Sequence, residues 1–164
     1  MKTPSRLFFG AILLACAGLL SFAIYLQEEV GLEPCPMCIL QRYAFTLIAI
    51  VALAAVIHGP RGGAFPKVYG ALVVLLAIAG GGVAARQSYI QHFPPATTSC
   101  GTDLEFLVNT FPISQALPKI FAGSADCAAV HWRLLGMSIA EWALVWFVLF
   151  VAATVWFAFA RKAR

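Results

Sequence analysis

Two cysteines three positions apart form the stretch of the sequence with the clearest chemical potential. Cys35 and Cys38 lie in EPCPMCILQRY, residues 33–43, and Arg42 comes four positions after Cys38. A C-x-x-C pair can cycle between dithiol and disulfide, close a static disulfide, or bind a metal ion. The thiolate is the reactive form, and both a helix N-terminus and a nearby cation favour it. Since Cys38 begins a long apolar run and shares a helical face with Arg42, the pattern favours a reactive thiol at Cys38.

A second pair, Cys100 and Cys127, brackets a segment later in the chain. A disulfide between them would close a loop of about 28 residues and stabilise the fold by about 3 kcal/mol in the chain-entropy model. However, Cys100 follows a Pro/Thr/Ser stretch with little to bury it, and exposed disulfides are the labile or catalytic ones. The pair alone leaves both possibilities open. Cys100 and Cys127 lack the close spacing of zinc ligands, so no metal site is predicted. The remaining cysteine, Cys16, is expected to pack inside a helix bundle.

The elements that must position these cysteines are membrane helices. The 164 residues are 62% hydrophobic and only 11% charged, against about 45–50% and 25% in soluble domains. Runs of about 20 apolar residues span the hydrocarbon core as helices. The sequence therefore predicts an all-α membrane protein: a single domain over 1–164 forming a bundle of four transmembrane helices, at about 7–26, 39–57, 68–86 and 139–160. The first run is interpreted as a retained helix rather than a signal peptide. Gly80–Gly82 predict a close helix approach or a site for a flat ligand.

The charges predict the orientation of this bundle. Seven of the 11 basic residues cluster at the two termini and between the second and third runs: Lys2, Arg6, Arg61, Lys67, Arg161, Lys162 and Arg164. The positive-inside rule then places both termini and the loop 58–67 in the cytoplasm. The loops 27–38 and 87–138, with all seven acidic residues nearby, face the outer side together with both cysteine pairs. This topology accounts for the net charge of +4 without a nucleic-acid partner.

The outer loop 87–138 contains an amphipathic stretch. Residues 104–121 mix apolar and polar side chains, and Pro112 and Pro118 are expected to interrupt any helix there. The stretch is too short to cross the bilayer. We expect one or two short helices lying on the membrane surface, or alternatively a loop packed on the ends of the bundle.

Two cysteine pairs on one membrane face, one beside an arginine at lipid depth, predict a redox relay. A cation near lipid is costly and tends to be functional. In this hypothesis electrons enter at the outer pair and leave through Cys35 and Cys38 to a lipid-soluble quinone. Two alternatives remain open: a related enzyme with a dedicated partner or running in the reducing direction, like the vitamin K epoxide reductases, and a four-helix scaffold with static disulfides.

The motifs resemble those of the disulfide bond formation protein B (DsbB) family. The resemblance rests on C-x-x-C followed by I-L-Q-R-Y, on Q-H-F-P-P before Cys100 and on S-A-D-C at Cys127, and it covers essentially the whole chain. It implies a quinone-dependent protein-disulfide oxidoreductase of the bacterial inner membrane with periplasmic redox loops. Such a protein reoxidises a periplasmic, thioredoxin-like DsbA-type oxidase and so sustains disulfide formation in exported proteins. The expected cofactor is ubiquinone, with menaquinone as the second candidate.

The resemblance also implies roles for individual residues. Cys100 would form a mixed disulfide with the partner, and Cys127 would pass electrons toward the C-x-x-C pair. Cys38, as a thiolate, would contact the quinone, with Arg42 stabilising the reduced quinone or the complex. Cofactor binding is further expected of Gln91, of Gln87, where the best-known family member has a histidine, and of Arg86 as a possible substitute for that histidine.

Overall fold

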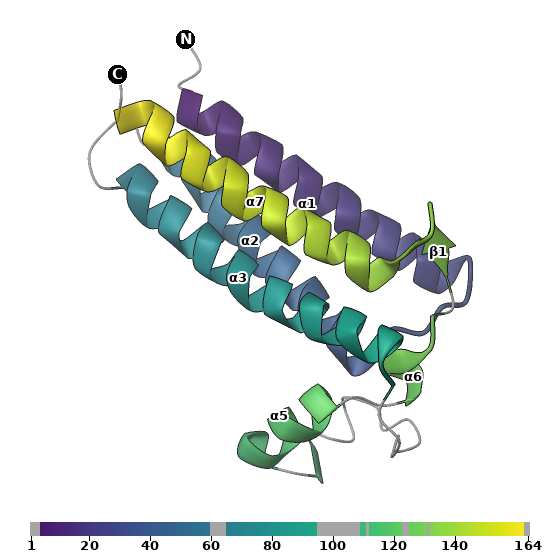
Figure 1. The fold of residues 1–164 in the computed structure, drawn as a ribbon. Coiled ribbons are helices and arrows are strands. Elements are labelled where there is room, and N and C mark those ends of the chain that lie inside the picture. The colour runs from purple at the N-terminus through teal and green to yellow at the C-terminus, as the bar shows by residue number, and fades with distance from the viewer. Residues whose placement is uncertain are drawn as a thin grey trace.

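Four long helices form one bundle in the computed structural model (Figure 1). The structure describes residues 4–59, 65–94, 109–110, 112–122, 125–130 and 132–162. The long helices are α1 (Pro4–Glu28), α2 (Pro36–His58), α3 (Phe65–His92) and α7 (Ile139–Lys162). All four are long and apolar enough to cross a membrane, which confirms the predicted four-helix membrane bundle.

Each long helix extends beyond the apolar run that predicted it. Hydropathy marks only the part of a helix that faces hydrocarbon, whereas backbone hydrogen bonding continues into the polar region. Helix α3 ends at His92 rather than near residue 86, so Gln87 and Gln91 lie on a helix and not in a loop. Helix α2 begins at Pro36, a residue favoured in the first turn, and Cys38 therefore lies inside that turn.

The helices pack in the order α1, α2, α3, α7, each mainly on its neighbours in that series. The core between them is aromatic: the rings of Phe45 and Phe147 stack with centroids 4.2 Å apart, and Phe150 meets Phe45 edge-on. A Cβ on Gly80 would overlap the Phe147 ring and lie 2.8 Å from the Ala44 Cβ. The glycine at this position therefore permits the close approach of α2, α3 and α7, as the sequence predicts.

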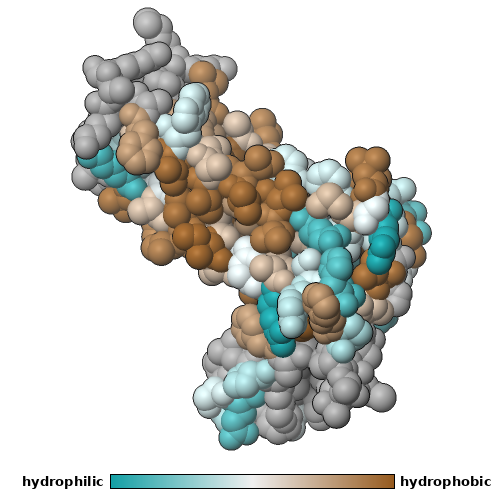
Figure 2. Space-filling view, viewed as in Figure 1, coloured by the Kyte–Doolittle hydropathy of each residue, from teal (hydrophilic) through white to brown (hydrophobic). Residues whose placement is uncertain are grey.

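The outside of the bundle is apolar, as a lipid-facing surface must be. Large exposed hydrophobic residues include Leu14, Ile57, Leu75 and Trp156, one from each long helix. Figure 2 shows hydrophobic residues over the middle of the bundle and hydrophilic ones gathered toward the end that carries α6 and β1. The start of α1 and the end of α7 both lie at the opposite end of the bundle (Figure 1).

The outer segment contains the predicted short amphipathic helix, α5 (Ile113–Ala122). Pro118 lies within this helix and does not end it, contrary to the expectation that it would interrupt the segment. Proline removes one hydrogen bond to the carbonyl four residues earlier, here that of Ser114. Ser114 is exposed, so water can satisfy this carbonyl. Residues 104–108 and 111 of the predicted amphipathic stretch lie outside the described residues.

A small hairpin that the sequence did not predict leads into α7. Strands β1 (Arg133–Leu134) and β2 (Met137–Ser138) are antiparallel, with Arg133 opposite Ser138. Leu135 and Gly136 between them have φ of 55° and 83°. Two central residues with positive φ define a type I′ turn, whose twist suits a two-residue hairpin. The hairpin thus turns the chain and delivers Ser138 to the start of α7.

Candidate functional site

Cys35 and Cys38 lie together at the N-terminus of α2. Cys35 is the N-cap residue in an extended conformation, and Pro36 follows at the first helical position. This start turns the Cys38 side chain back toward Cys35, and the two Sγ atoms are 3.4 Å apart. The structure thus holds the pair as neighbouring thiols, with Cys38 at the positive end of the helix dipole.

Cys127, from the other outer loop, contacts Cys35. It lies on α6 (Ala125–Ala128), is buried, and hydrogen-bonds with the Cys35 thiol. Both belong to an apolar cluster with Met37, Ile90 and Ile120. Cys127 and the C-x-x-C pair therefore lie at the same end of the bundle, in one group of three thiols. Cys100 lies outside the described residues.

The environment of Cys35 keeps its thiol protonated. Hydrogen bonds with the Cys127 and Cys38 thiols, together with burial, raise the pKa of Cys35 well above its usual range. At neutral pH Cys35 is then a thiol rather than a thiolate. Because only the thiolate is nucleophilic, this environment disfavours Cys35 as the nucleophile of the pair.

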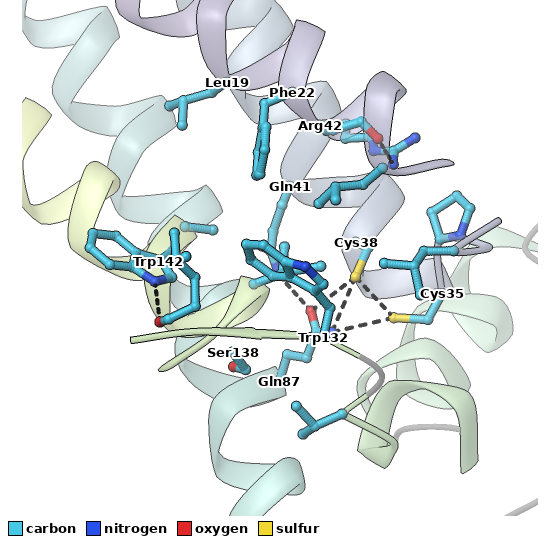
Figure 3. Close-up of a pocket in the computed structure, with 18 of the residues that line it drawn as sticks. Leu19, Phe22, Cys35, Cys38, Gln41, Arg42, Gln87, Trp132, Ser138 and Trp142 are labelled. Atoms are coloured by element: carbon cyan, nitrogen blue, oxygen red, sulfur yellow. Dashed lines mark hydrogen bonds between the residues drawn. The ribbon is translucent and has the colours of Figure 1, made fainter. Parts of the chain in front are cut away.

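Gln87 on α3 contacts both sulfur atoms of the pair. Its Nε2 donates to Cys38 Sγ at 3.2 Å and to Cys35 Sγ at 3.4 Å, and its Oε1 accepts from Gln41 Nε2 at 2.6 Å. Gln41 and Gln87 are both almost fully buried. Figure 3 shows this amide between Gln41 and the two cysteines. The N–H end of Gln87 is thus placed where it can stabilise negative charge on sulfur.

The Arg42 guanidinium reaches across to the last turns of α1. Nη1 donates to Gln27 Oε1 at 2.6 Å, and Nη2 donates to the Ala23 carbonyl at 3.0 Å. The end of a helix carries partial negative charge, which favours a cation there. Arg42 therefore shares a helical face with Cys38, as predicted, but its charge is held by α1.

Cys38 and Arg42 line one cavity of about 350 Å³ (Figure 3). Residues from all four long helices and from the hairpin form its wall. Its polar lining includes Cys35, Cys38, Gln41, Arg42, Gln87, Gln91 and Ser138, and its aromatic lining includes Phe22, Phe45, Trp132, Trp142 and Trp146. A mostly apolar cavity with a few donors beside a reactive sulfur fits a flat ring with two carbonyl oxygens, such as a quinone.

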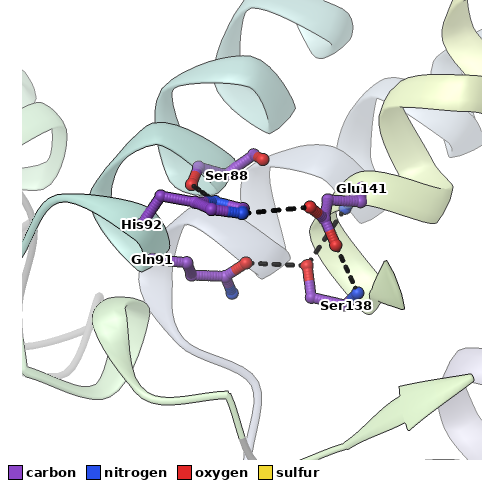
Figure 4. Close-up of polar contacts among 5 residues, drawn as sticks. All are labelled: Ser88, Gln91, His92, Ser138 and Glu141. Carbon is purple, nitrogen blue, oxygen red and sulfur yellow. Dashed lines mark hydrogen bonds and ion pairs between the residues drawn. The ribbon is translucent and has the colours of Figure 1, made fainter. Parts of the chain in front are cut away.

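Gln91 lines the cavity one turn after Gln87 and is tied to the start of α7. Ser138 Oγ donates to Gln91 Oε1 at 2.7 Å (Figure 4). Nearby, His92 Nε2 lies 3.7 Å from Glu141 Oε1, and its Nδ1 lies 2.9 Å from the Ser88 carbonyl. The His92 side chain is 60% exposed, so this ion pair adds little to stability. The part-buried Ser138–Gln91 bond is what fixes the amide.

Arg86 is not part of the cavity lining. Its Nε donates to the Phe121 carbonyl at 3.1 Å, and its guanidinium carbon lies 5.5 Å from the centre of the Tyr89 ring. It connects α3 to the end of α5. The structure thus brings together five predicted site residues in the cavity, places Cys127 beside them, and directs Arg86 elsewhere.

Sequence reasoning missed several polar residues of this site, among them Gln27, Gln41 and Ser138. Gln41 is three positions after Cys38, on the same helical face, which is a local signal that could have pointed to it. Ser138 begins S-x-x-E, a capping-box pattern that could have marked the start of α7. Nothing local indicated Gln27, because its contact with Arg42 joins two helices.

Comparisons with known proteins show what the chain is similar to along nearly its whole length. The family model described as disulfide bond formation protein DsbB matches residues 5–157. The chain is 49% identical over 159 residues to disulfide bond formation protein B of Azoarcus sp. (strain BH72), covering 97% of this chain and 95% of that protein. It is 55% identical over 141 residues to the protein of the same name from Aromatoleum aromaticum, covering 86% and 84%. The corresponding protein of Polaromonas naphthalenivorans is 46% identical over 164 residues, covering 100% and 96%.

Proposed function

The chain belongs to the disulfide bond formation protein B family, and from this premise we propose a path for electrons through its own residues. Members are quinone-dependent disulfide oxidoreductases of the inner membrane that reoxidise DsbA, the DsbA–DsbB–quinone route of the bacterial periplasm. Membership sets aside both the static scaffold and the reducing enzyme. The proposal concerns which cysteine does what, and where the quinone binds.

Electrons enter at Cys100. A thiolate of the reduced DsbA-like partner attacks the Cys100–Cys127 disulfide at Cys100, forming a mixed disulfide and releasing Cys127 as a thiolate. When the partner's second thiol attacks that mixed disulfide, the partner leaves oxidised and Cys100 becomes a thiol. Two electrons have then passed from the partner to this chain.

Electrons move inward from Cys127 through Cys35. The packing of Cys127 and Cys35 together in one buried cluster is the single observation that carries the proposal, because exchange needs sulfur atoms in contact. The Cys127 thiolate attacks the Cys35–Cys38 disulfide at Cys35, forming a Cys127–Cys35 disulfide, and Cys38 leaves as a thiolate holding the electron pair. Cys100 then attacks the Cys127–Cys35 disulfide at Cys127, which restores Cys100–Cys127 and leaves Cys35 as a thiol. The protonated state favoured for free Cys35 makes it a poor nucleophile in the reverse direction.

Cys38 is the exit. Its sulfur lies in the cavity, where the Gln87 N–H and the helix N-terminus favour its charge. A quinone held in this cavity would supply the two-electron oxidation that returns Cys35 and Cys38 to their disulfide, and would be released as the quinol with two protons. Arg42 supplies positive charge at the cavity, where negative charge develops on the ring oxygens. Gln91, and in part Gln87, supply neutral donors that orient the ring.

Ubiquinone is the first candidate for the ring, and menaquinone is the second. The cavity volume of about 350 Å³ is near the lower end of the range of roughly 300–1,000 Å³ for ligand pockets. A single benzoquinone ring is smaller than the fused naphthoquinone of menaquinone, which favours ubiquinone. The apolar wall from α1 and α7 suits the isoprenoid tail, since both helices also face lipid.

The redox end of the bundle faces the periplasm, and both termini lie in the cytoplasm. Basic residues concentrate at the start of α1, before and at the start of α3, and at the end of α7, as the positive-inside rule requires of a cytoplasmic side. The cysteine cluster lies at the other end of the same helices. In this orientation the outer loop 87–138, whose sequence includes Cys100, belongs to the periplasmic side.

A trapped mixed disulfide tests the entry step and the orientation together. In a Cys127→Ser variant of the full chain in membranes, Cys100 is a thiol that attacks the disulfide of the oxidised periplasmic partner and leaves the partner's second sulfur as a thiolate. Because no Cys127 thiol is present to displace the partner from Cys100, the Cys100 adduct should accumulate. It is identified by non-reducing electrophoresis and mass spectrometry. The control is Cys16→Ala, which removes a thiol buried outside the relay. No adduct at Cys100, or an equal amount in both variants, contradicts the proposal.

A further inference from the structure

Gln41 is a buried amide that has no role in the proposed path of electrons. It is 4% exposed, lies on α2 one turn after Cys38, and donates to Gln87 Oε1 at 2.6 Å. A polar group buried in a membrane bundle is costly and would be replaced by leucine if only packing mattered. The short bond between two buried amides therefore calls for a functional explanation.

The bond decides which end of the Gln87 amide faces sulfur. Because Oε1 accepts from Gln41, the N–H end of Gln87 points at Cys38 Sγ, 3.2 Å away. Oε1 itself lies 3.7 Å from the same sulfur, a poorer contact for the thiol proton. If the amide turned round, its oxygen would face Cys38, which would repel a thiolate.

The orientation matters because Gln87 carries no charge of its own. A neutral amide stabilises an anion only through the direction of its N–H bonds, and the same group reversed would act in the opposite sense. Gln41 is the residue whose hydrogen bond sets this direction among the contacts of Gln87 in the described structure.

We infer that Gln41 is a positioning residue that holds the Gln87 N–H toward Cys38 and so stabilises the Cys38 thiolate. The inference rests on the proposed function, in which Cys38 is the exit for electrons. Gln41 acts only through Gln87, and this coupling separates the inference from a general packing role.

The test measures Cys38 reactivity without quinone or partner. The full chain, reduced in detergent, is alkylated with iodoacetamide at pH 7, and the rate at Cys38 is followed by mass spectrometry of its peptide. Alkylation reports the thiolate fraction. Gln41→Leu should slow Cys38 alkylation about tenfold, the factor expected for losing one hydrogen bond to a charged group. Gln115→Leu, the same change at an exposed site on α5, should leave the rate unchanged.

A double-mutant cycle shows whether the effect passes through Gln87. Gln87→Leu alone should also slow Cys38 alkylation, and adding Gln41→Leu to it should cause no further loss. An unchanged rate in Gln41→Leu overturns the inference. So does a full additional loss in the Gln87→Leu background, since Gln41 would then act independently of that amide.

Cys16 reports whether the variants keep their fold. It is fully buried in the core, so its alkylation stays slow in a folded bundle. If Gln41→Leu makes Cys16 reactive, Gln41→Met, which keeps the side-chain length, replaces it with the same expected results. Quinone turnover of the unaltered chain is measured separately. Its absence would contradict the proposed function, whereas a normal turnover with an unchanged Gln41→Leu rate would contradict only the role of Gln41.

Discussion

Arg42 illustrates how far a single residue can be interpreted from spacing alone. Its position four residues after Cys38 correctly places it on the cavity side of α2. Its hydrogen bonds, however, go to Gln27 and to the Ala23 carbonyl on α1. The guanidinium is therefore held beside the site in a fixed place by a second helix, which is the arrangement that electrostatic stabilisation of a developing charge requires.

Removing the Arg42 charge should impair the quinone step and spare the entry step. We expect Arg42→Ala to lower kcat/KM for quinone by about a hundredfold or more, because a preorganised donor at a reaction centre is worth about 3 kcal/mol. The change in quinone absorbance measures the rate of the quinone step. The amount of Cys100 mixed disulfide formed measures the entry step. Lys67→Ala, an exposed cation at the far end of α3, is the control. Unchanged quinone kinetics in Arg42→Ala would show that the charge has no part in the reaction.

The hairpin and the start of α7 form the element that orients Gln91. Ser138 and Glu141 make a reciprocal capping box: the Glu141 N–H donates to Ser138 Oγ at 3.3 Å, and the Ser138 N–H donates to Glu141 Oε2 at 2.6 Å. The same Ser138 hydroxyl donates to Gln91 Oε1. One side chain thus starts a transmembrane helix and fixes an amide in the cavity.

Ser138→Ala should therefore have two effects. Loss of the cap should lower the free energy of unfolding by about 1 kcal/mol. Release of the Gln91 amide should raise KM for quinone, whereas a helix cap without a role in the cavity would change only stability. Thermal unfolding in detergent and quinone kinetics separate the two. Ser21→Ala, on the exposed face of α1, is the matched substitution and should change neither quantity. An unaltered KM in Ser138→Ala would mean that the cap does not position Gln91.

At the scale of the whole molecule, the bundle depends on the close contact at Gly80. Three helices meet there, with the Phe147 ring and the Ala44 methyl group against the glycine. Interiors are close-packed, so an added methyl group must displace its neighbours. The Phe45–Phe147 stack lies next to this contact, and Phe45 also lines the cavity.

Two glycine substitutions in one helix test this packing. Gly80→Ala should destabilise the bundle, by an amount typical of overpacking, about 1–3 kcal/mol. Gly82→Ala meets nothing within 4 Å and should be neutral or stabilising, because alanine favours helix by up to about 1 kcal/mol over glycine. Thermal unfolding of the two variants in one detergent provides the measurement. Equal stability in both would refute the close contact at Gly80.

The amino-acid sequence by itself determined the membrane class, the four spanning helices and the closeness of the two C-x-x-C thiols at the start of a helix. These depend on local properties: the length of an apolar run, and the position of Cys38 near a helix start and an arginine. Helix ends were less well determined, because α3 continues through polar residues such as Gln87 and Gln91 after the hydropathy has fallen.

Only the tertiary structure decided which side chains meet. The contact of Cys127 with Cys35, the bond from Gln41 to Gln87, and the anchoring of Arg42 on α1 each join residues from different elements. Such contacts depend on how helices pack and rotate against one another, which a periodic pattern along one helix does not specify. Arg86 is adjacent to Gln87 in sequence but contacts α5 instead of the cavity. Adjacent residues on a helix point in different directions, so closeness in sequence did not place Arg86 in the site.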